Sequence, residues 1–291
     1  MNGKRVFAVF AACIGGGVIV ALHRGRAVRR DNSWPLNFAH RGASLRAPEN
    51  TLEAFRLASE AGGLELDVHL TSDGCLAVIH DDLVDRTTDG TGFVREMTLR
   101  EVQILDAGYR FTPDGGVTYP YRGRGVRVPE LGEVLRKLPD YKVNIDIKEA
   151  CPGIEATVLS TIEEADAEER TLVVSEMPDV TRRFRRLSGG KVSTGASRRE
   201  ISIFYRLSRL RLEYLLRPAY AALQVPVRYG RHELVTPRFL AAAHGRGLRV
   251  DVWTIDDARE MRRLLDLGVD VIMTNRPELL ARILGERRRP E

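Results

Sequence analysis

The sequence predicts an α/β protein folded as a (β/α)8 barrel, the TIM-barrel architecture. Short apolar runs recur along the chain, helical stretches separate them, and clusters of polar residues fall where the runs end. Eight runs are predicted strands: Leu36–His40, Leu64–Leu70, Lys142–Ile147, Thr171–Ser175, Lys191–Thr194, Ala221–Pro226, Leu248–Thr254 and Val269–Thr274. This alternation is typical of parallel βαβ units and suggests a closed barrel. An open, doubly wound sheet would produce nearly the same pattern.

The stretches between the strands carry helix signals. The clearest are Asn50–Ala61, Gly153–Ala165, Thr236–Gly245 and Asp256–Leu267. Thr236-Pro237 and Asp256-Asp257 supply the residue types that are common at helix starts. These segments therefore read as the helices that connect successive strands.

The chain begins with an apolar segment. Val6–Leu22 contains no charged residue, and its 17 residues are close to the shortest length that spans a bilayer. We expect residues 1–31 to form an uncleaved membrane anchor with a basic linker, and residues 32–286 to form the barrel. A cleaved signal peptide is the alternative, although no small-residue cleavage site follows the run. The Arg-rich stretch after the segment favours a cytoplasmic barrel.

Composition excludes several classes of protein. Hydrophobic residues at 43% and charged residues at 29% are normal for a globular protein. Three widely separated cysteines exclude a disulfide framework. The net charge of +5 fits an anionic substrate or lipid surface, or equally a solvated Arg-rich surface. No nucleic-acid-binding motif accompanies the Arg clusters, so no nucleic-acid partner is expected.

One further apolar run, Leu76–His80, interrupts the alternation. It follows the second strand after only five residues, too few for a parallel crossover, so the two should form a β-hairpin. With Asp73-Gly74 as the turn, Asp67 lies opposite His80. Opposed residues point to the same face, so the hairpin is expected to set the His80 ring beside Asp67.

Polar residues gather at the ends of the predicted strands. They are His40-Arg41-Gly42, Glu65-Leu66-Asp67, His80-Asp81 and Asn144-Ile145-Asp146-Ile147-Lys148. In a barrel, the C-terminal strand ends line one shared mouth. Glu65, Asp67 and Asp146 would repel one another when buried unless a cation joins them. Three carboxylates make a hard-oxygen site suited to Mg²⁺ or Ca²⁺ rather than zinc.

Basic residues and histidines complete this set. Arg41 and Lys148 supply positive charge for a phosphate group. His40 and His80 are suited to act as base and acid near neutral pH. The combination indicates metal-dependent chemistry on a phosphate ester.

These residues stand in motifs that resemble one family. The motifs are His40-Arg41-Gly42, Pro48-Glu49-Asn50-Thr51, Glu65-Leu66-Asp67, His80-Asp81, Arg86-Thr87-Thr88, Asn144–Lys148, Trp253-Thr254 and Thr274-Asn275-Arg276-Pro277. Over residues 36–284 the chain resembles the glycerophosphodiester phosphodiesterase family. The resemblance implies a divalent metal on Glu65, Asp67 and Asp146, and a phosphate at Arg41 and Lys148. It also implies that His40 and His80 form an acid–base pair, in either order, and that the nucleophile is water or a neighbouring substrate hydroxyl. It also implies supporting roles for Glu49, Asn50 and Trp253.

The motif Asn144–Lys148 departs from the family pattern. Many members carry Glu where this chain has Asp146, and the Asn-Ile-Asp-Ile-Lys version is similar to the branch that acts as lysophospholipase D. A shorter side chain implies metal contact through water or a closer strand.

Two segments bear on the substrate. Val6–Leu22 would hold the barrel at a bilayer, and Ile201–Ala222 mixes apolar residues with Arg at helical spacing. The second segment suits a helix in a lipid headgroup layer, or an ordinary barrel helix. Tyr109–Arg127 is expected to be a loop at the mouth of the barrel, or a surface loop.

We therefore expect hydrolysis of a lysophospholipid at a membrane surface, with release of the headgroup alcohol. The alternative is a water-soluble glycerophosphodiester, which would give glycerol 3-phosphate and an alcohol. Two other hypotheses are a binding protein without catalysis and a sphingomyelin- or phosphatidylinositol-cleaving relative on the same barrel. The first is disfavoured because every expected catalytic residue is present, and the second because residues 48–51 and 86–88 fit the glycerophosphodiesterase pattern better.

Overall fold

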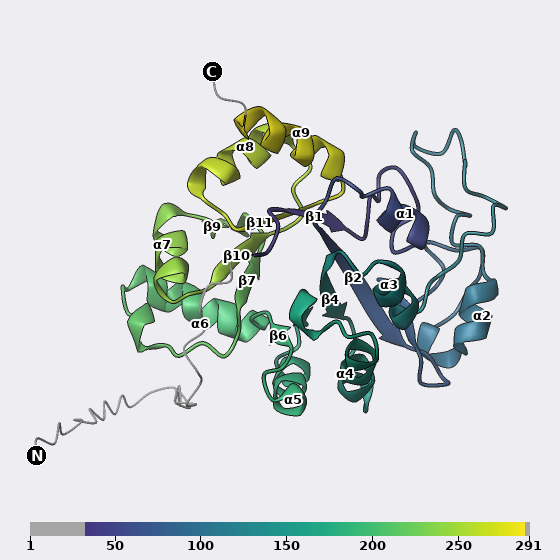
Figure 1. Ribbon diagram of the computed structural model, residues 1–291, viewed down its shortest axis with the longest axis horizontal. Helices are drawn as coiled ribbons and strands as arrows, with labels where there is room; N and C mark the ends of the chain where they lie inside the picture. Colours follow the sequence, from purple (N-terminus) through teal and green to yellow (C-terminus); the bar gives the residue numbers. More distant parts are fainter. Residues whose placement is uncertain (1–32, 289–291) are drawn as a thin grey trace, which may run out of the picture.

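The computed structural model describes residues 33–288, which form a barrel of parallel strands surrounded by helices (Figure 1). In these residues eight strands lie in the order β6-β5-β4-β2-β1-β11-β10-β7. They are β1 (Asn37–His40), β2 (Gly63–Leu70), β4 (Lys142–Ile147), β5 (Thr171–Val174), β6 (Ser193–Thr194), β7 (Ala222–Val225), β10 (Arg249–Val252) and β11 (Val271–Thr274). A parallel bridge between Gly195 and Ala222 joins β6 to β7. The barrel prediction is confirmed, and the open-sheet alternative is wrong.

Helices cover the outside of the barrel. They are α1 (Leu52–Arg56), α2 (Leu99–Ile104), α3 (Leu131–Lys137), α4 (Ile154–Glu164), α5 (Pro178–Ser188), α6 (Arg198–Arg209), α7 (Pro237–Gly245), α8 (Ala258–Leu267) and α9 (Pro277–Arg288). The side chains of Thr51, Thr236 and Asp257 each accept a hydrogen bond from the backbone N–H three residues further on. These N-caps satisfy donors that the first helical turn leaves free, and so define where each helix begins.

Strand β2 shows how the alternation of side chains positions the site. Leu64, Leu66 and Val68 are fully buried in the core between the strands and the helices. Glu65 and Asp67 alternate with them and therefore point to the opposite face, into the barrel. Apolar residues thus pack outward beneath the helices, while the carboxylates face the axis.

The predicted hairpin exists, but its predicted register is wrong. Strand β3 (Leu76–Val78) pairs antiparallel with β2, and Leu70 lies opposite Leu76. The pairing is shifted by one residue from the expected one, because the Thr71 hydroxyl binds both Asp73 and the Cys75 N–H and closes a five-residue loop. Asp67 is consequently not paired with His80 in the ladder.

The segment around α6 folds as a barrel helix. Phe204 is fully buried and meets the ring of Phe239 edge-on, with 5.6 Å between the ring centroids. A short 3₁₀ helix, η3 (Glu213–Leu215), follows α6. The barrel-helix alternative therefore describes this segment.

The predicted membrane location is contradicted by the part of the chain that the structure describes. Among residues 33–288 no helix is long and apolar enough to cross a bilayer. The longest, α6 and α9, have 12 residues each, whereas a span needs about 20 apolar residues. The predicted anchor Val6–Leu22 lies outside the described residues.

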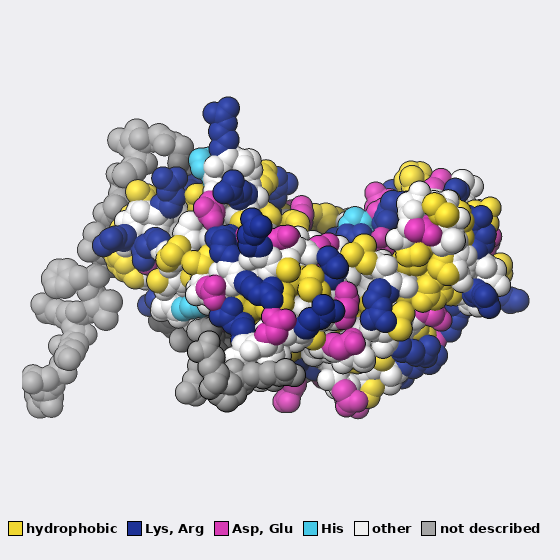
Figure 2. Space-filling view, turned by 90° about the horizontal axis from the view of Figure 1, so that it is seen from above, with side chains coloured by type: hydrophobic (Ala, Val, Ile, Leu, Met, Phe, Trp, Pro, Cys, Tyr) yellow, Lys and Arg dark blue, Asp and Glu magenta, His cyan; other side chains and the backbone are white. Residues whose placement is uncertain are grey.

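The positive net charge does not gather into one patch on the face shown in Figure 2. Lys and Arg side chains there are scattered among acidic and apolar ones. On this face the basic charge is therefore mixed with other side chains rather than concentrated.

Candidate active site

The end of β1 and the turn after it set the first group of side chains. Arg41 and Gly42 follow His40 with φ of 56° and 83°, in the left-handed region. A Cβ on Gly42 would lie 2.7 Å from Ala54, so only glycine permits this approach to α1. The turn directs the Arg41 backbone N–H to the Glu65 carboxylate, at 3.1 Å.

Three carboxylates meet at the mouth of the barrel. Glu65 and Asp67 come from β2 and Asp146 from β4, and Asp67 and Asp146 are direct neighbours in the parallel register. One oxygen from each of the three lies within 4.8 Å of the others. Asp67 has no exposed surface, and Glu65 is 5% exposed. We refer to these three residues as the carboxylate cluster.

Two cations and one amide contact this cluster. The Lys148 Nζ lies 2.9 Å from Asp67 Oδ1 and 2.7 Å from Asp146 Oδ2. The Arg41 Nε lies 3.1 Å from Asp67 Oδ2, and the Asn50 side-chain N–H donates to the same oxygen at 2.8 Å. Asp67 is therefore the best-compensated member of the cluster.

The pKa values reflect this unequal compensation. Burial would raise the pKa of Asp67, but Lys148 and Arg41 outweigh it and lower that pKa. Burial and the neighbouring Asp67 raise the pKa of Glu65 well above its usual value. Burial, with Asp67 adding to it, raises the pKa of Asp146 to about 6. The cluster holds more negative charge than its neighbours offset, so its chemistry fits a bound cation.

His40 is held through one ring nitrogen. Asn275 donates its side-chain N–H to Asp256 at 2.7 Å, which turns its carbonyl oxygen towards the His40 Nδ1 at 2.8 Å. Nδ1 must then carry the proton, because its partner is an acceptor. The His40 Nε2 is left unprotonated, 3.9 Å from Glu65 Oε2. Burial and Arg41 lower the pKa of His40.

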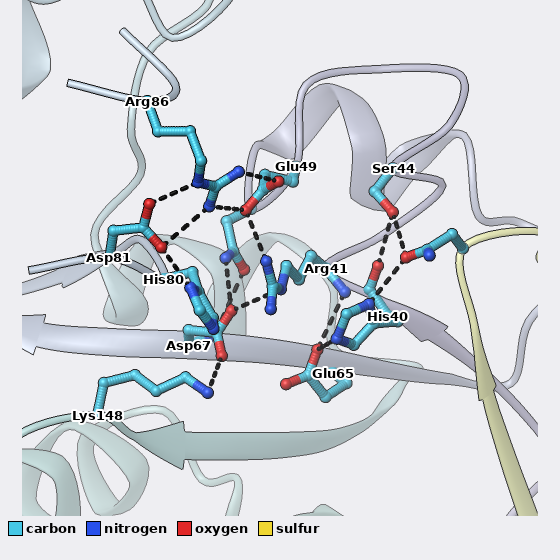
Figure 3. A network of polar contacts seen from close by, with 12 residues as sticks. His40, Arg41, Ser44, Glu49, Glu65, Asp67, His80, Asp81, Arg86 and Lys148 are labelled. Atoms are coloured by element: carbon cyan, nitrogen blue, oxygen red, sulfur yellow. Dashed lines mark hydrogen bonds and ion pairs between the residues drawn. The ribbon is translucent and has the colours of Figure 1, made fainter. Parts of the chain in front are cut away.

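His80 leaves the hairpin after β3, and Figure 3 shows its ring beside Asp67. The expected proximity is present although the ladder register that predicted it is not. The His80 Nδ1–H donates to Asp81 at 2.5 Å. Arg86, chiefly by hydrogen bonding, lowers the pKa of Asp81 to about 2 and keeps it a carboxylate.

Arg86 joins the two sides of the site (Figure 3). Its guanidinium donates twice to Glu49, at 2.8 Å each, and twice to Asp81, at 2.5 and 3.2 Å. Glu49 also accepts from Arg41 at 2.9 Å. A continuous series of charged hydrogen bonds therefore runs from His80 to Arg41.

Trp253 lies at the other side of the mouth. It is 37% exposed and lines a pocket of about 580 Å³ that also contacts Asp146. Tyr205 from α6 and Tyr229 from the short hairpin β8 (Arg228–Tyr229) and β9 (His232–Glu233) line the same pocket. No residue of the loop at 109–127 lines this pocket in the described structure.

The sequence reasoning missed several residues of this site. Ser44 and Glu176 received no role, Asp256 entered only as a helix start, and Asp81, Asn275 and Arg86 entered only as parts of motifs. Glu176 lies close enough to raise the pKa of Asp146. Only for Asp81 was there a signal, since it follows His80 directly.

Comparisons with known proteins identify the family and the fold. The model of the glycerophosphoryl diester phosphodiesterase family matches residues 40–279. A glycerophosphodiester phosphodiesterase of Caldanaerobacter subterraneus is 37% identical over 259 residues, covering 86% of this chain and 97% of that protein. The crystal structure of a glycerophosphodiester phosphodiesterase from Agrobacterium tumefaciens has a TM-score of 0.69 at 27% identity, covering 84% and 98%. A phosphodiesterase from Oleispira antarctica, solved with the product sn-glycerol-3-phosphate, shares the fold, with a TM-score of 0.67 at 22% identity, covering 87% and 97%.

Proposed function

Because this chain belongs to the glycerophosphoryl diester phosphodiesterase family, we propose that it hydrolyses water-soluble glycerophosphodiesters to glycerol 3-phosphate and an alcohol. The chain is a phosphoric diester hydrolase. The observation that carries the proposal is the carboxylate cluster, flanked at one mouth by two cations and two imidazoles. The product found with the Oleispira antarctica enzyme supports glycerol 3-phosphate as the phosphorylated product.

The carboxylate cluster is proposed to bind Mg²⁺ or Ca²⁺. Its ligands are carboxylate oxygens, which both ions prefer, and burial together with the neighbouring Asp67 raises the pKa values of Glu65 and Asp146, so a bound cation would stabilise their charged forms. A bound divalent ion would polarise a phosphoryl oxygen and offset the charge that develops on it. Arg41 and Lys148 stand at the edge of the cluster, where they would hold the remaining phosphate oxygens.

The two histidines are proposed to divide the proton transfers. The unprotonated Nε2 of His40 would accept a proton from the attacking water, and burial and Arg41, which lower the pKa of this ring, favour its neutral form. His80, whose Nδ1–H donates to the Asp81 carboxylate, would act in its doubly protonated form and donate the Nε2 proton to the departing alkoxide. Hydrolysis then breaks the bond between phosphorus and the alcohol oxygen, and the oxygen of water enters the phosphate.

Product analysis of glycerophosphocholine in H₂¹⁸O tests this function. The expected products are choline and glycerol 3-phosphate, with one ¹⁸O in the phosphate by mass spectrometry. Phosphocholine and glycerol would place the cleavage at the other ester bond and contradict the proposal. The absence of turnover with either metal present would contradict it as well.

A lysophospholipid is the second candidate substrate, and the Asn144–Lys148 motif supports it. The two segments that first suggested it add little. Val6–Leu22 lies outside the described residues, and α6 is a barrel helix with Phe204 in the core. The water-soluble diester is therefore the better-supported substrate.

A further inference from the structure

A third histidine, His69, contacts the segment that carries the proposed general acid. It lies on β2 two residues after Asp67, so it points to the same face of the strand as Glu65 and Asp67. Its side chain is only 3% exposed, whereas that of His80 is 31% exposed. A side chain this buried is poorly placed to touch a substrate, so its part in the reaction has to pass through the residues that it contacts.

The first of these contacts is to the backbone of His80. The His69 Nε2 lies 3.0 Å from the His80 carbonyl oxygen. A carbonyl only accepts, so Nε2 carries a proton and donates it. Strand β3 ends at Val78, two residues before His80, so the ladder with β2 no longer holds this part of the backbone. The His69 ring therefore extends the connection between β2 and the hairpin past the last ladder pair.

The other ring nitrogen of His69 faces two carboxylates. Nδ1 lies 3.6 Å from Glu149 Oε1 and 3.7 Å from Asp82 Oδ1. The Glu149 side chain is 15% exposed and also accepts the Leu70 backbone N–H at 2.6 Å, whereas the Asp82 side chain is 72% exposed. Glu149 is the firmer anchor, because water and salt screen an exposed charge. Since Glu149 follows Lys148, the ring is held between β2 and the segment after β4.

His80 is consequently held at two places. Asp81 accepts from its Nδ1 and so limits rotation of the ring (Figure 3). His69 holds its carbonyl oxygen, and with it the backbone from which the ring extends. The position of the His80 Nε2 depends on both the side-chain torsions and the backbone. A misplacement of about 1 Å in a reacting group can cost about 10²-fold in rate.

We propose that His69 is a positioning residue that keeps the Nε2–H of His80 aimed at the oxygen of the leaving alcohol. The proposal rests on the function above, in which His80 protonates that oxygen. His69 acts through the His80 carbonyl and not on the substrate. Loss of this hydrogen bond should therefore weaken acid catalysis and leave substrate binding and the attack of water intact.

Two amide side chains separate the contacts of the His69 ring. The amide nitrogen of Gln reaches nearly as far as the Nε2 of His, so His69→Gln can still donate to the His80 carbonyl. Asn is one methylene shorter, and its amide reaches only to the position of Nδ1. His69→Asn thus keeps a polar group beside Glu149 but loses the hydrogen bond to His80. The two variants differ in the contact on which the proposal depends.

The leaving group shows whether an acid is used. The alkoxide of choline takes up a proton as it departs, whereas p-nitrophenolate is stable enough to leave without one. The two substrates are glycerophosphocholine and the p-nitrophenyl ester of glycerol 3-phosphate, with Mg²⁺ or Ca²⁺ saturating. His69→Asn should lower kcat about 10- to 100-fold on the first and less than about threefold on the second. His69→Gln should stay within about threefold on both, and KM should change little in either variant.

A reference variant and a matched control complete the design. His80→Ala should show the same dependence on the leaving group. In the His80→Ala background, His69→Asn should lower kcat by less than about twofold further, because the residue that it positions is gone. His244→Asn is the control, since the His244 Nε2 lies 2.9 Å from Asp270, just before β11 and at the end of the barrel opposite the mouth. Both of its rates should stay near normal.

The outcomes separate the positioning role from the chemistry and from the fold. Both substrates are measured on the same sample, so the ratio of their rates does not depend on the folded fraction. An unchanged ratio in His69→Asn, an equal loss in His69→Gln, or a loss that multiplies in full with that of His80→Ala overturns the positioning role. If His80→Ala itself lacks the dependence on the leaving group, His80 is not the acid and the proposal falls with that assignment. Hydrolysis of glycerophosphocholine by the unaltered protein would still leave the phosphodiesterase function standing.

Discussion

At the residue scale, the chemistry of His40 depends on an amide that is far away in the sequence. Asp256 accepts from the Asn275 side chain and thereby fixes which end of the amide faces His40. That orientation decides the tautomer of the ring. Ser44 adds a second contact to the Asn275 oxygen at 2.8 Å. The proposed base is therefore oriented by Asn275, Asp256 and Ser44, none of which belongs to the carboxylate cluster.

The pH dependence of the reaction should reflect the pKa of His40 and its contact with Asn275. Burial and Arg41 lower the pKa of His40, so with metal saturating, kcat/KM should fall only as the pH drops below about 6.5, the usual histidine value. The hydrogen bond that the His40 Nδ1–H donates to Asn275 raises that pKa, so Asn275→Leu should move the acidic limb to still lower pH and reduce kcat about tenfold. Ser44→Ala, which leaves the amide in place, is the control. An acidic limb above pH 6.5, or one that Asn275→Leu leaves in place, would contradict the assignment.

Removal of either imidazole should lower the reaction rate strongly. His40→Ala and His80→Ala are each expected to lower kcat by at least about 10²-fold, the usual scale for a general acid or base. Far-UV circular dichroism should show that both variants fold. Near-normal turnover in either one would disprove its proposed role.

At the element scale, the site depends on how the β2–β3 hairpin is held against the start of α1. The hairpin delivers His80 and Asp81, whereas the turn before α1 delivers Glu49. Arg86 is the only residue in the described structure that donates hydrogen bonds to both acids. Its four hydrogen bonds fix the relative position of two elements that share no strand pairing.

Arg86→Ala should therefore lower kcat with little change in KM, because Arg86 orients His80 and Arg41 rather than binding the substrate. We expect a loss of about 10- to 100-fold, partial recovery in Arg86→Lys, and partial rescue of the alanine variant by millimolar guanidinium. Lys is a weaker replacement because it lacks the planar fork that binds two carboxylates. Arg95→Ala is the matched control, since the Arg95 side chain is 64% exposed and contacts Glu96 and the Phe93 ring rather than Asp81 or Glu49. A kcat for Arg86→Ala equal to that of the control would exclude the positioning role.

At the scale of the whole molecule, closing the barrel concentrates negative charge. Because the barrel strands are parallel, their C-terminal ends meet at one mouth. Carboxylates from β2 and β4 therefore become neighbours. In the metal-free protein, stability should fall as the pH rises from about 4.5 through the raised pKa of Glu65, because the folded state then loses the proton that it holds more tightly. The cluster thus lowers the stability of the metal-free protein and allows metal binding to raise it.

Thermal melting measures both effects. Mg²⁺ or Ca²⁺ at a hundredfold excess over Kd should raise the free energy of unfolding by about 2.7 kcal/mol through binding to the folded state, and so raise Tm. A chelator should reverse this shift and abolish activity. Glu65→Gln should raise the Tm of the metal-free protein at neutral pH and remove most of the metal-dependent increase. Glu164→Gln, on the exposed face of α4, should do neither. A Tm that does not depend on metal, with full activity in chelator, would refute the metal site.

The local pattern of the sequence determined the strands and the polar groups at their ends. The prediction for Lys142–Ile147 matches β4 at both ends, and Glu65 and Asp67 face the barrel as their alternation with leucine indicates. Side-chain periodicity encodes which face of an element is buried, and that information lies within a few residues. The same pattern did not set the hairpin register, because the Thr71 loop chose the pairing.

Only the tertiary structure decided which distant residues meet. His40 contacts Asn275 because β1 pairs with β11, an adjacency that exists only when the first and last strands of the barrel come together. Arg86 reaches Glu49 because β1 pairs with β2, which sets the turn before α1 beside the β2–β3 hairpin. Such contacts depend on how the strands pair and leave no periodic trace in the chain, so the sequence indicated the reactive groups but not their partners.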